Sequence, residues 1–234
     1  MISEIDWGYP QSFFACGFGL TAWEANDIIY AGSYTYGEKG ADIVSDNLAY
    51  QEEVWEELIG GEVVAMSPRP MYNHNHIAFN IAFMFQDYLR GKRCTVIPDG
   101  TDLYLTEEDR FIPDVMVVCD REKIQRNGVH GAPDLVVEVL SPSTAKNDRL
   151  CKKAVYGACG VREYWLVDPE NRTIEQYFLQ DGKLELNTVY VSYTEDVLER
   201  MKAEERAALE THFKCSLYDD FDIPLEDIFS GLLP

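Results

Sequence analysis

The segment 133–143, with the sequence PDLVVEVLSPS, places the carboxylate Glu138 in the middle of an apolar run. The valines and leucines around it predict a strand that is buried on both faces. An unpaired carboxylate in that position would cost several kcal/mol or would be forced to take up a proton. We therefore expect a basic side chain, hydrogen bonds or a metal ion to compensate Glu138.

The rest of the chain alternates short apolar runs with helical patterns. Ile77, Ile81, Phe85 and Leu89 recur every four residues, which predicts a helix over 74–92. The other expected elements are helices at 50–58, at 147–158 and within 194–213, and strands at 60–68, 94–100, 101–106, 110–120, 132–141, 163–169, 173–180 and 183–192. Strands dominate the middle and helices flank them, so we expect an α/β (α+β) core around a mixed β-sheet.

Two dipeptides mark turns between these strands. Asp181-Gly182 is a strong hairpin signal between 173–180 and 183–192, and Asp99-Gly100 is expected to join 94–100 to 101–106. The length of 234 residues allows one large domain with appendages. We expect an irregular N-terminal extension at 1–47, a core at 48–190, and a helical and tail segment at 191–234 packed on the same domain.

The charge and the cysteines limit the function. A formal net charge of -21 argues against capture of nucleic acid by bulk charge and against binding to anionic membrane, although a site that holds divalent metal remains compatible with it. Six cysteines form no CxxC pair, and we expect them to be reduced core residues of a cytoplasmic protein. We find no signal peptide, and the apolar run 13–23 is too short to span a bilayer.

Further polar residues accompany Glu138 on neighbouring elements. Asp114 follows a proline at the head of the strand VMVV, and two carboxylates on adjacent strands can share a hard cation such as Mg²⁺. Asp148, Lys152 and Tyr156 are spaced by four residues, which places them on one face of the helix that follows. Glu138 and Lys152 could equally form a purely structural ion pair, because buried pairs of this kind also perturb pKa values.

The order of these motifs resembles a known family. The strings PDV, PDLVVEVLSPST, D-x3-K-x3-Y and GVREYWLVDP, within about 50–178, resemble the Uma family of restriction endonucleases in the PD-(D/E)xK nuclease superfamily. The resemblance implies a restriction endonuclease-like fold, a mixed sheet flanked by helices, with an Asp and a Glu that hold Mg²⁺ and a Lys that assists the attacking water. Asp114 and Glu138 match the two acidic residues.

The lysine departs from the superfamily pattern. The pattern expects it two residues after the Glu, where this chain has Leu140. The departure is similar to members in which the following helix supplies the lysine, and Lys152 is then the candidate. Lys153 lies about 100° around the helix and should face elsewhere.

The resemblance implies further site residues and partners. Glu62 is a candidate for an additional catalytic acidic residue, and His74 occupies a recurrent family position without an assigned role. His74 and His76 do not share a helical face, which argues against a two-histidine metal site. We expect DNA as the substrate, Mg²⁺ as the cofactor with Mn²⁺ as a substitute, and a homodimer by resemblance to superfamily members that cut both strands.

Three functions follow from these observations. The leading hypothesis is a Mg²⁺-dependent endonuclease that hydrolyses phosphodiester bonds in DNA. The charge of -21 and the missing strand lysine motivate an alternative, a catalytically inactive nuclease-fold protein that binds a partner or assembles. The third is a hydrolase of a small phosphorylated substrate, for which the bulk charge matters less.

Overall fold

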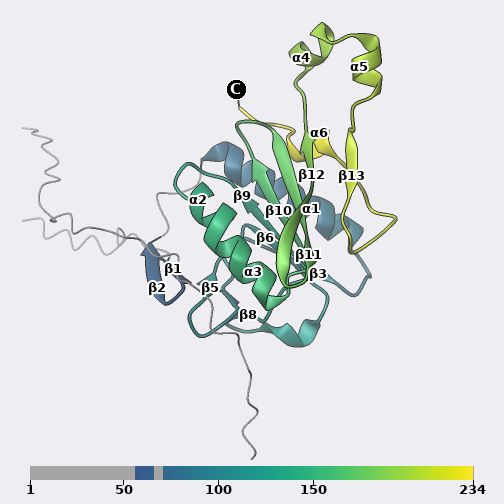
Figure 1. The fold of residues 1–234 in the computed structure, drawn as a ribbon. Helices are drawn as coiled ribbons and strands as arrows, with labels where there is room; N and C mark the ends of the chain where they lie inside the picture. Colours follow the sequence, from purple (N-terminus) through teal and green to yellow (C-terminus); the bar gives the residue numbers. More distant parts are fainter. Residues whose placement is uncertain (1–55, 66–70, 234) are drawn as a thin grey trace, which may run out of the picture. The chain divides into compact units, whose positions relative to one another are not determined.

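The computed structural model describes residues 56–65 and 71–233. A central sheet is built from β3 (Thr95–Pro98), β6 (Val115–Val118), β9 (Leu135–Val139), β10 (Glu163–Asp168), β11 (Thr173–Gln180) and β12 (Lys183–Val191). Its strand order is β12-β11-β10-β9-β6-β3 (Figure 1). The β9–β10 pair is parallel and the other neighbours are antiparallel, so the sheet is mixed, as the sequence predicts.

A second sheet consists of shorter strands. They are β1 (Glu56–Ile59), β2 (Glu62–Ala65), β4 (Leu103–Tyr104), β5 (Arg110–Phe111), β7 (Ile124–Gln125) and β8 (Gly128–His130), with a 3₁₀ turn at Arg121–Lys123 before β7. Their order is β2-β1-β5-β4-β8-β7. Leu58 of β1 pairs with Arg110 of β5, three residues before Pro113, and this pairing holds β1 close to the start of β6.

Helices cover both faces of the central sheet (Figure 1). On one face lies α1 (Tyr72–Tyr88), and on the other lie α2 (Ala145–Asn147), a π-helical turn (Asp148–Lys152) and α3 (Lys153–Cys159). The α1 side of the core contains Ile77, Ile81 and Phe85 with Val115, Val137 and Trp165, and the α3 side contains Tyr156 with Met116, Val136 and Leu166. Because both faces are covered, β6, β9 and β10 need the nearly continuous apolar runs that the sequence shows.

The helix boundaries follow the expected signals. Helix α1 begins two residues earlier than the predicted 74–92 and ends four residues earlier. The second helical segment ends at Gly160, whose φ of +93° is the left-handed conformation common after a helix and favourable for glycine. Among the described residues, no helix combines the length and the apolar character needed to cross a membrane.

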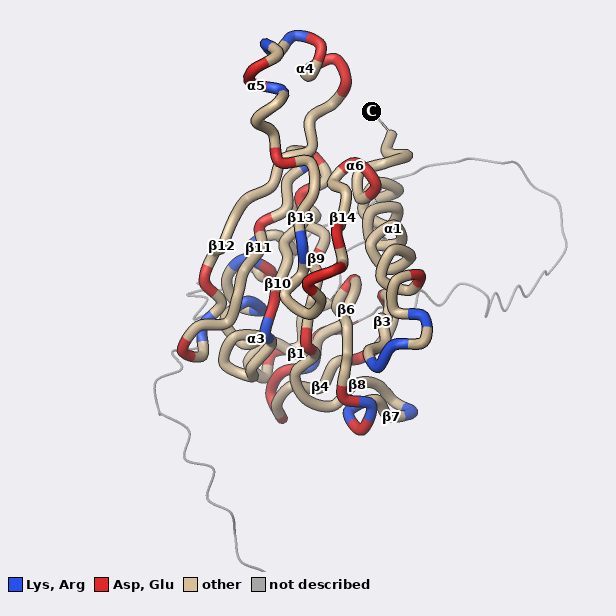
Figure 2. The backbone as a smooth tube through the Cα atoms, turned by 90° about the vertical axis from the view of Figure 1, so that its right-hand side faces the viewer, with Lys and Arg blue, Asp and Glu red and all other residues tan. Residues whose placement is uncertain are grey.

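The C-terminal part of the chain completes the core on the α1 side. It comprises α4 (Glu195–Arg200), α5 (Ala203–Ala207), β13 (His212–Lys214), β14 (Asp222–Pro224) and α6 (Leu225–Ile228). Phe213, Ile223 and Ile228 are buried in the same cluster as the inner face of α1. Helices α4 and α5 instead form an arm that extends away from the sheets (Figures 1 and 2).

Three predictions about secondary structure are wrong. Residues 56–58 are expected in a helix but belong to β1, because the turn Gly60-Gly61 lets β1 pair with β2 as a hairpin. Residues 50–55 and the expected extension 1–47 lie outside the described residues. The strands 94–100 and 101–106 do not pair at Asp99-Gly100, because β3 and β4 belong to different sheets. The strand 110–120 is split into β5 and β6 around Pro113, which cannot donate a backbone hydrogen bond. The Asp181-Gly182 hairpin is confirmed.

The expectation that all cysteines are reduced is wrong for one pair. Cys94 and Cys119 form a disulfide. Thr95 pairs with Val118 in the antiparallel β3–β6 ladder, so the next pair outward places these two cysteines opposite each other. Cys159 and Cys215 belong to no disulfide among the described residues. The two cysteines are 25 residues apart in the sequence, so their pairing follows only from the register of the β3–β6 ladder.

Candidate active site

The strand register brings Asp114 and Glu138 together. Val115 pairs with Val137 in the antiparallel β6–β9 ladder, and one step further along the ladder Asp114 lies opposite Glu138. The backbone N–H of Val139 donates to Oδ2 of Asp114 at 2.7 Å. Opposed residues of antiparallel strands project from the same face, so both carboxylates point to the side of the sheet that α3 covers.

Lys152 and Tyr156 approach Glu138 from the helix. The Lys152 ammonium lies 3.3 Å from Oε1 of Glu138, and the Tyr156 hydroxyl donates to the same oxygen at 2.7 Å. The contact that the sequence predicts between Lys152 and Glu138 is therefore present. Lys153 faces elsewhere, as expected, with its ammonium 4.5 Å from the centre of the Tyr177 ring.

Two more carboxylates surround Lys152. Its nitrogen lies 2.9 Å from Oε1 of Glu57 and 3.3 Å from Oδ1 of Asp148, the second at an ion-pair distance without hydrogen-bond alignment. Glu57 Oε1 also accepts the backbone N–H of Ile112 at 2.9 Å, which fixes the carboxylate. Lys152 is only 2% exposed, so burial strengthens each of these attractions.

The helix that carries these residues is wound as a π-helix where it passes the site. The turn Asp148–Lys152 is π-helical, and α3 continues from it to Tyr156. Single π turns inside α-helices are frequent at functional sites. Asp148, Lys152 and Tyr156 all face the sheet and are buried, which confirms the shared face expected from their spacing.

The first turns of α1 contribute a histidine. Nε2 of His74 lies 3.4 Å from Oδ2 of Asp114, and Nδ1 is buried without a hydrogen-bond partner among the described residues. His76 faces away from the site and stacks on Tyr72 with ring centres 5.2 Å apart. The two histidines therefore do not share a site, as the spacing predicts.

Burial dominates the protonation of the two central carboxylates. It raises the pKa of Asp114 to about 6, against the lowering effects of His74, the Val139 N–H and Lys152. Burial likewise raises the pKa of Glu138 well above its usual value, and only the Lys152 charge among the main influences opposes it. Both carboxyls are thus poised to take up protons or a cation.

For Lys152, the neighbouring charges together affect the pKa more than burial does. Burial alone lowers its pKa, but the charges of Glu138, Asp148 and Glu57 outweigh burial and hold the pKa well above its usual value. The side chain therefore remains an ammonium group at neutral pH. An ammonium can donate hydrogen bonds and stabilise negative charge, but it cannot accept a proton.

The predicted acidic residue Glu62 is not brought to this cluster. It is exposed at the start of β2, opposite Ile59, whereas Glu57 of β1 is 4% exposed and contacts Lys152. The helix expected at 50–58 gives no reason to place Glu57 at the site, because that position belongs to β1 instead. Asp99, which the sequence predicts as a turn residue, also raises the pKa of Asp114 through its charge.

The carboxylate cluster offers only a few possible ligands for a divalent ion. Among residues 56–65 and 71–233, no group of three or more His, Cys, Asp and Glu side chains is arranged to hold a metal. Oδ1 of Asp114 and Oε2 of Glu138 have no hydrogen-bond partner in this part of the chain. In contrast, both oxygens of the buried Glu163 are each occupied by two donors, from Trp165, Gln176 and Ser216. Since Mg²⁺ commonly uses one or two carboxylates with waters and phosphate oxygens, Asp114 and Glu138 fit such a site.

The basic residues that the sequence offers as possible contacts of a nucleic acid are Arg69, Arg90, Lys92, Arg93, Lys146, Arg149, Lys152 and Lys153. Those described below do not form an exposed basic cluster at the two carboxylates. Arg149 is paired with Glu175 at 2.8 Å, Lys153 lies over Tyr177, and Lys152 is buried. Arg90, Lys92 and Arg93 follow the C-terminal end of α1, whereas His74 is near its beginning (Figure 2). Arg69 lies outside the described residues.

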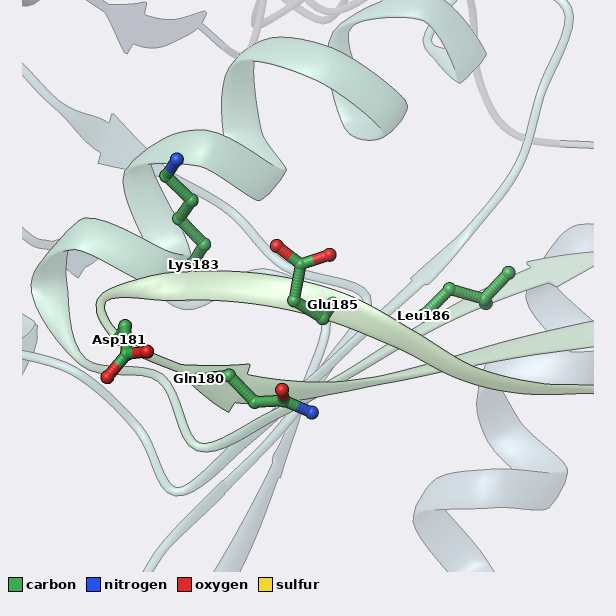
Figure 3. A pocket seen from close by; sticks show the side chains of 5 residues that line it. All are labelled: Gln180, Asp181, Lys183, Glu185 and Leu186. Carbon is green, nitrogen blue, oxygen red and sulfur yellow. The ribbon is translucent and has the colours of Figure 1, made fainter.

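A surface hollow occurs elsewhere, at the turn between β11 and β12 (Figure 3). It is lined by Gln180, Asp181, Lys183, Glu185 and Leu186. The turn of the β11–β12 hairpin lies beside the start of β10, because Phe178 of β11 pairs with Glu163. Glu138 of β9 pairs with Leu166, which is near the other end of β10. The hollow therefore does not belong to the carboxylate cluster.

The fold and the cluster define the class of protein. A mixed sheet between helices, with an Asp and a Glu opposite each other on adjacent strands, agrees with the restriction endonuclease-like fold that the resemblance implies, whereas the lysine comes from the following helix. The family model "Uma2: Putative restriction endonuclease" matches residues 46–206, and the chain belongs to this family.

Two relatives illustrate the match. An uncharacterized protein of Synechocystis sp. (strain PCC 6803) is 28% identical over a 158-residue alignment; the match covers 62% of this chain and 83% of the relative. The crystal structure of "a putative nuclease belonging to DUF820" from Anabaena variabilis has a TM-score of 0.57 and 19% identity, and the alignment covers 75% of this chain and 89% of that chain. At this identity the likeness shows the fold.

Proposed function

We propose that the chain is a metal-dependent endonuclease that hydrolyses phosphodiester bonds in DNA. The observation that carries the proposal is the meeting of Lys152 with Glu138, which lies opposite Asp114 on the neighbouring strand. The three residues come from two strands and a helix, and each carries the chemical group that the PD-(D/E)xK reaction requires. Family membership supports the same class of reaction.

Asp114 and Glu138 would hold the metal. The Lys152 ammonium is in ion-pair contact with Glu57, Glu138 and Asp148, and Asp114 lies opposite Glu138, so the cluster has an excess of negative charge when the four carboxylates are ionised. Buried like charges repel, and a divalent cation would offset this excess. The chemistry that a bound Mg²⁺ supplies is polarisation of the scissile phosphate and a lower pKa for a coordinated water.

Lys152 would act as a donor. Glu57, Asp148 and Glu138 keep it protonated and fix its position, so the ammonium can orient the attacking water or stabilise negative charge developing on the phosphate. Glu57 and Asp148 are then positioning residues, because they act through Lys152. Tyr156 fixes Oε1 of Glu138 by its hydrogen bond and leaves Oε2 available.

The test is cleavage of supercoiled plasmid DNA with Mg²⁺ by four proteins: wild type, Asp114→Asn, Glu138→Gln and Glu62→Gln. We expect wild type and Glu62→Gln to nick the plasmid, and the two site variants to be inactive. Equal nicking by all four proteins would mean a contaminating nuclease and would contradict the proposal. Hydrolysis of a small phosphodiester with intact plasmid would instead favour the hydrolase of small substrates.

A second candidate is a nuclease-fold protein that binds a partner without cutting. Two observations favour it: the net charge of -21 and the low exposure of Glu138 and Lys152, 3% and 2%, which limits access of a DNA duplex. Calorimetric titration with Mn²⁺ separates the two candidates. Binding that Glu138→Gln removes supports the nuclease, and no heat at millimolar Mn²⁺ supports the non-cutting protein.

A further inference from the structure

Helix α1 carries a line of aromatic rings on its outer face. Tyr72, His76, Phe79 and Phe83 are spaced by four, three and four residues, and they form what we call the aromatic stripe. Successive ring centres are 5.2, 6.5 and 6.1 Å apart, and each pair is stacked. At about 100° per residue the four positions fall within a narrow sector of the helix.

This stripe lies opposite the face that α1 buries in the core. Tyr72, Phe79 and Phe83 are 52%, 63% and 57% exposed, whereas Ile77 and Ile81 are fully buried. A helix on a protein surface normally has a polar outer face, and a helix that is apolar on both sides is normally covered on both. The stripe therefore has the character of a contact surface.

The C-terminal tail extends the same surface. Asn73 and Leu233 exchange two hydrogen bonds, Asn73 Nδ2 to the Leu233 carbonyl at 3.0 Å and the Leu233 N–H to Asn73 Oδ1 at 2.8 Å. Gly231 has a φ of +69°, and a Cβ there would lie 2.5 Å from Nε2 of His76. The tail is thus fixed against the stripe, and Leu233 adds a side chain that is 59% exposed.

The helical part of this surface also lacks charge. The sequence 71–86 contains no Asp, Glu, Lys or Arg, in a chain whose formal net charge is -21 (Figure 2). Two copies of such an acidic chain repel each other over most of their surface. A long uncharged face is where they can approach with the least repulsion.

We propose that the aromatic stripe and Leu233 form the contact between two copies of this chain in a two-fold symmetric dimer. The stripe runs along the helix for roughly 16 Å, so two antiparallel copies of α1 can place the same residues against each other. With roughly 200 Å² per large side chain, the four exposed apolar residues present about 450 Å² per copy. A stable interface buries about 800 Å² per partner, with an apolar centre and a polar rim.

The stripe supplies that centre, and polar groups beside it supply the rim. Asn75 and Gln86 are exposed on α1, and backbone groups of the tail lie next to the stripe. Nucleic acid does not fit this face, since it offers no cation to a phosphate. An anionic membrane does not fit an acidic chain without basic residues beside the apolar line.

Sedimentation equilibrium of the full chain tests the proposal with three proteins: wild type, Phe79→Asp and Leu186→Asp. Leu186 is a matched control, because it is 52% exposed on β12 and receives the same acidic substitution (Figure 3). We expect wild type and Leu186→Asp to be dimers. Phe79→Asp should weaken dimerisation about a thousandfold, because each substitution at an interface centre counts twice in a symmetric dimer.

Salt and cross-linking complete the test. The wild-type dimer should strengthen as salt screens the repulsion between acidic copies. A benzoylphenylalanine in place of Phe79 should give a product of twice the chain mass, which does not depend on the stability of Phe79→Asp. A wild-type monomer at every concentration, a stable Phe79→Asp dimer, or cross-links only to residues 1–55 of the same chain would each overturn the proposal.

Discussion

The Lys152 ammonium lies 3.3 Å from Oε1 of Glu138 across 14 residues of sequence, from a helix to a strand. The strand position where the superfamily pattern has its lysine is occupied by Leu140, which is 7% exposed and packs in the core on the α3 side. The long side chain of a lysine allows its backbone position to change while its charge keeps its place. The geometry supports the proposal that Lys152 replaces the strand lysine.

Replacement of Lys152 by Met should cost stability as well as activity. The variant leaves Glu57, Glu138 and Asp148 buried without their shared cation, and removal of one partner from a buried ion pair typically costs about 3–5 kcal/mol. Urea unfolding at neutral pH measures this loss. Plasmid cleavage should be abolished, whereas Mn²⁺ should still bind, because lysine is not a ligand.

Lys153→Met is the control for this experiment. Lys153 lies over the Tyr177 ring, a contact worth about 0.5–1 kcal/mol at an exposed site, so its loss should be small. A Lys152→Met protein as stable as Lys153→Met would show that the three carboxylates do not depend on Lys152. Cleavage by Lys152→Met would remove this residue from the proposed mechanism.

Glu57 and Glu62 provide a second matched pair. Glu57→Gln keeps an acceptor for the Ile112 N–H but removes one negative charge from Lys152, and we expect a loss of about 1–3 kcal/mol with reduced cleavage. Glu62→Gln, on an exposed strand position, should change unfolding by less than about 0.5 kcal/mol. Thermal unfolding and plasmid cleavage of both variants measure the difference. Equal effects would contradict the assignment of Glu57 to the site.

Local sequence patterns predict much of this fold. The four-residue spacing of Ile77, Ile81 and Phe85 predicts α1, and the valine runs predict β6 and β9, because both faces of these strands are buried. Glu138 in an apolar strand also predicts a compensating group, whereas the choice of Lys152 came from the resemblance to the nuclease family. These signals depend on the nearest neighbours of each residue in its own element.

The remaining features depend on contacts that are distant in sequence. Glu57 reaches Lys152 only because β1 pairs with β5 beside the start of β6. Cys94 and Cys119 meet only through the β3–β6 register. The four-residue spacing does not predict the apolar outer face of α1, because such a spacing identifies only one apolar face of a helix. No local pattern carries this information.

The disulfide gives a third prediction. Peptide mapping without reduction should find Cys94 linked to Cys119. A loop of 25 residues closed by a disulfide corresponds to about 3 kcal/mol in the chain-entropy estimate, so reductant should lower the melting temperature. The Cys94→Ala/Cys119→Ala protein should melt at the lower temperature with or without reductant. A wild-type melting temperature that reductant does not change would contradict this expectation.

The pKa of Asp114 predicts how pH affects the metal-free protein. Burial raises this pKa from 3.8 to about 6, so the folded protein binds the proton more tightly than the unfolded chain does. The resulting stabilisation is fully present below pH 3.8 and is lost as pH rises through about 6. It amounts to about 3 kcal/mol. Asp114→Asn should lose the part of the pH dependence that Asp114 contributes and keep that of Glu138, whose pKa burial also raises, and urea unfolding of both proteins across this pH range measures the difference.

The metal should reverse the direction of that pH dependence. A cation requires ionised ligands, so Mn²⁺ affinity should fall about tenfold for each pH unit below the Asp114 pKa of about 6. Glu138, whose pKa burial also raises, makes the slope steeper. Calorimetric titration one pH unit below and one above pH 6 measures the change, and saturating Mn²⁺ should stabilise the protein more at the higher pH. Equal Mn²⁺ affinity at both pH values would exclude Asp114 and Glu138 as a pair of metal ligands.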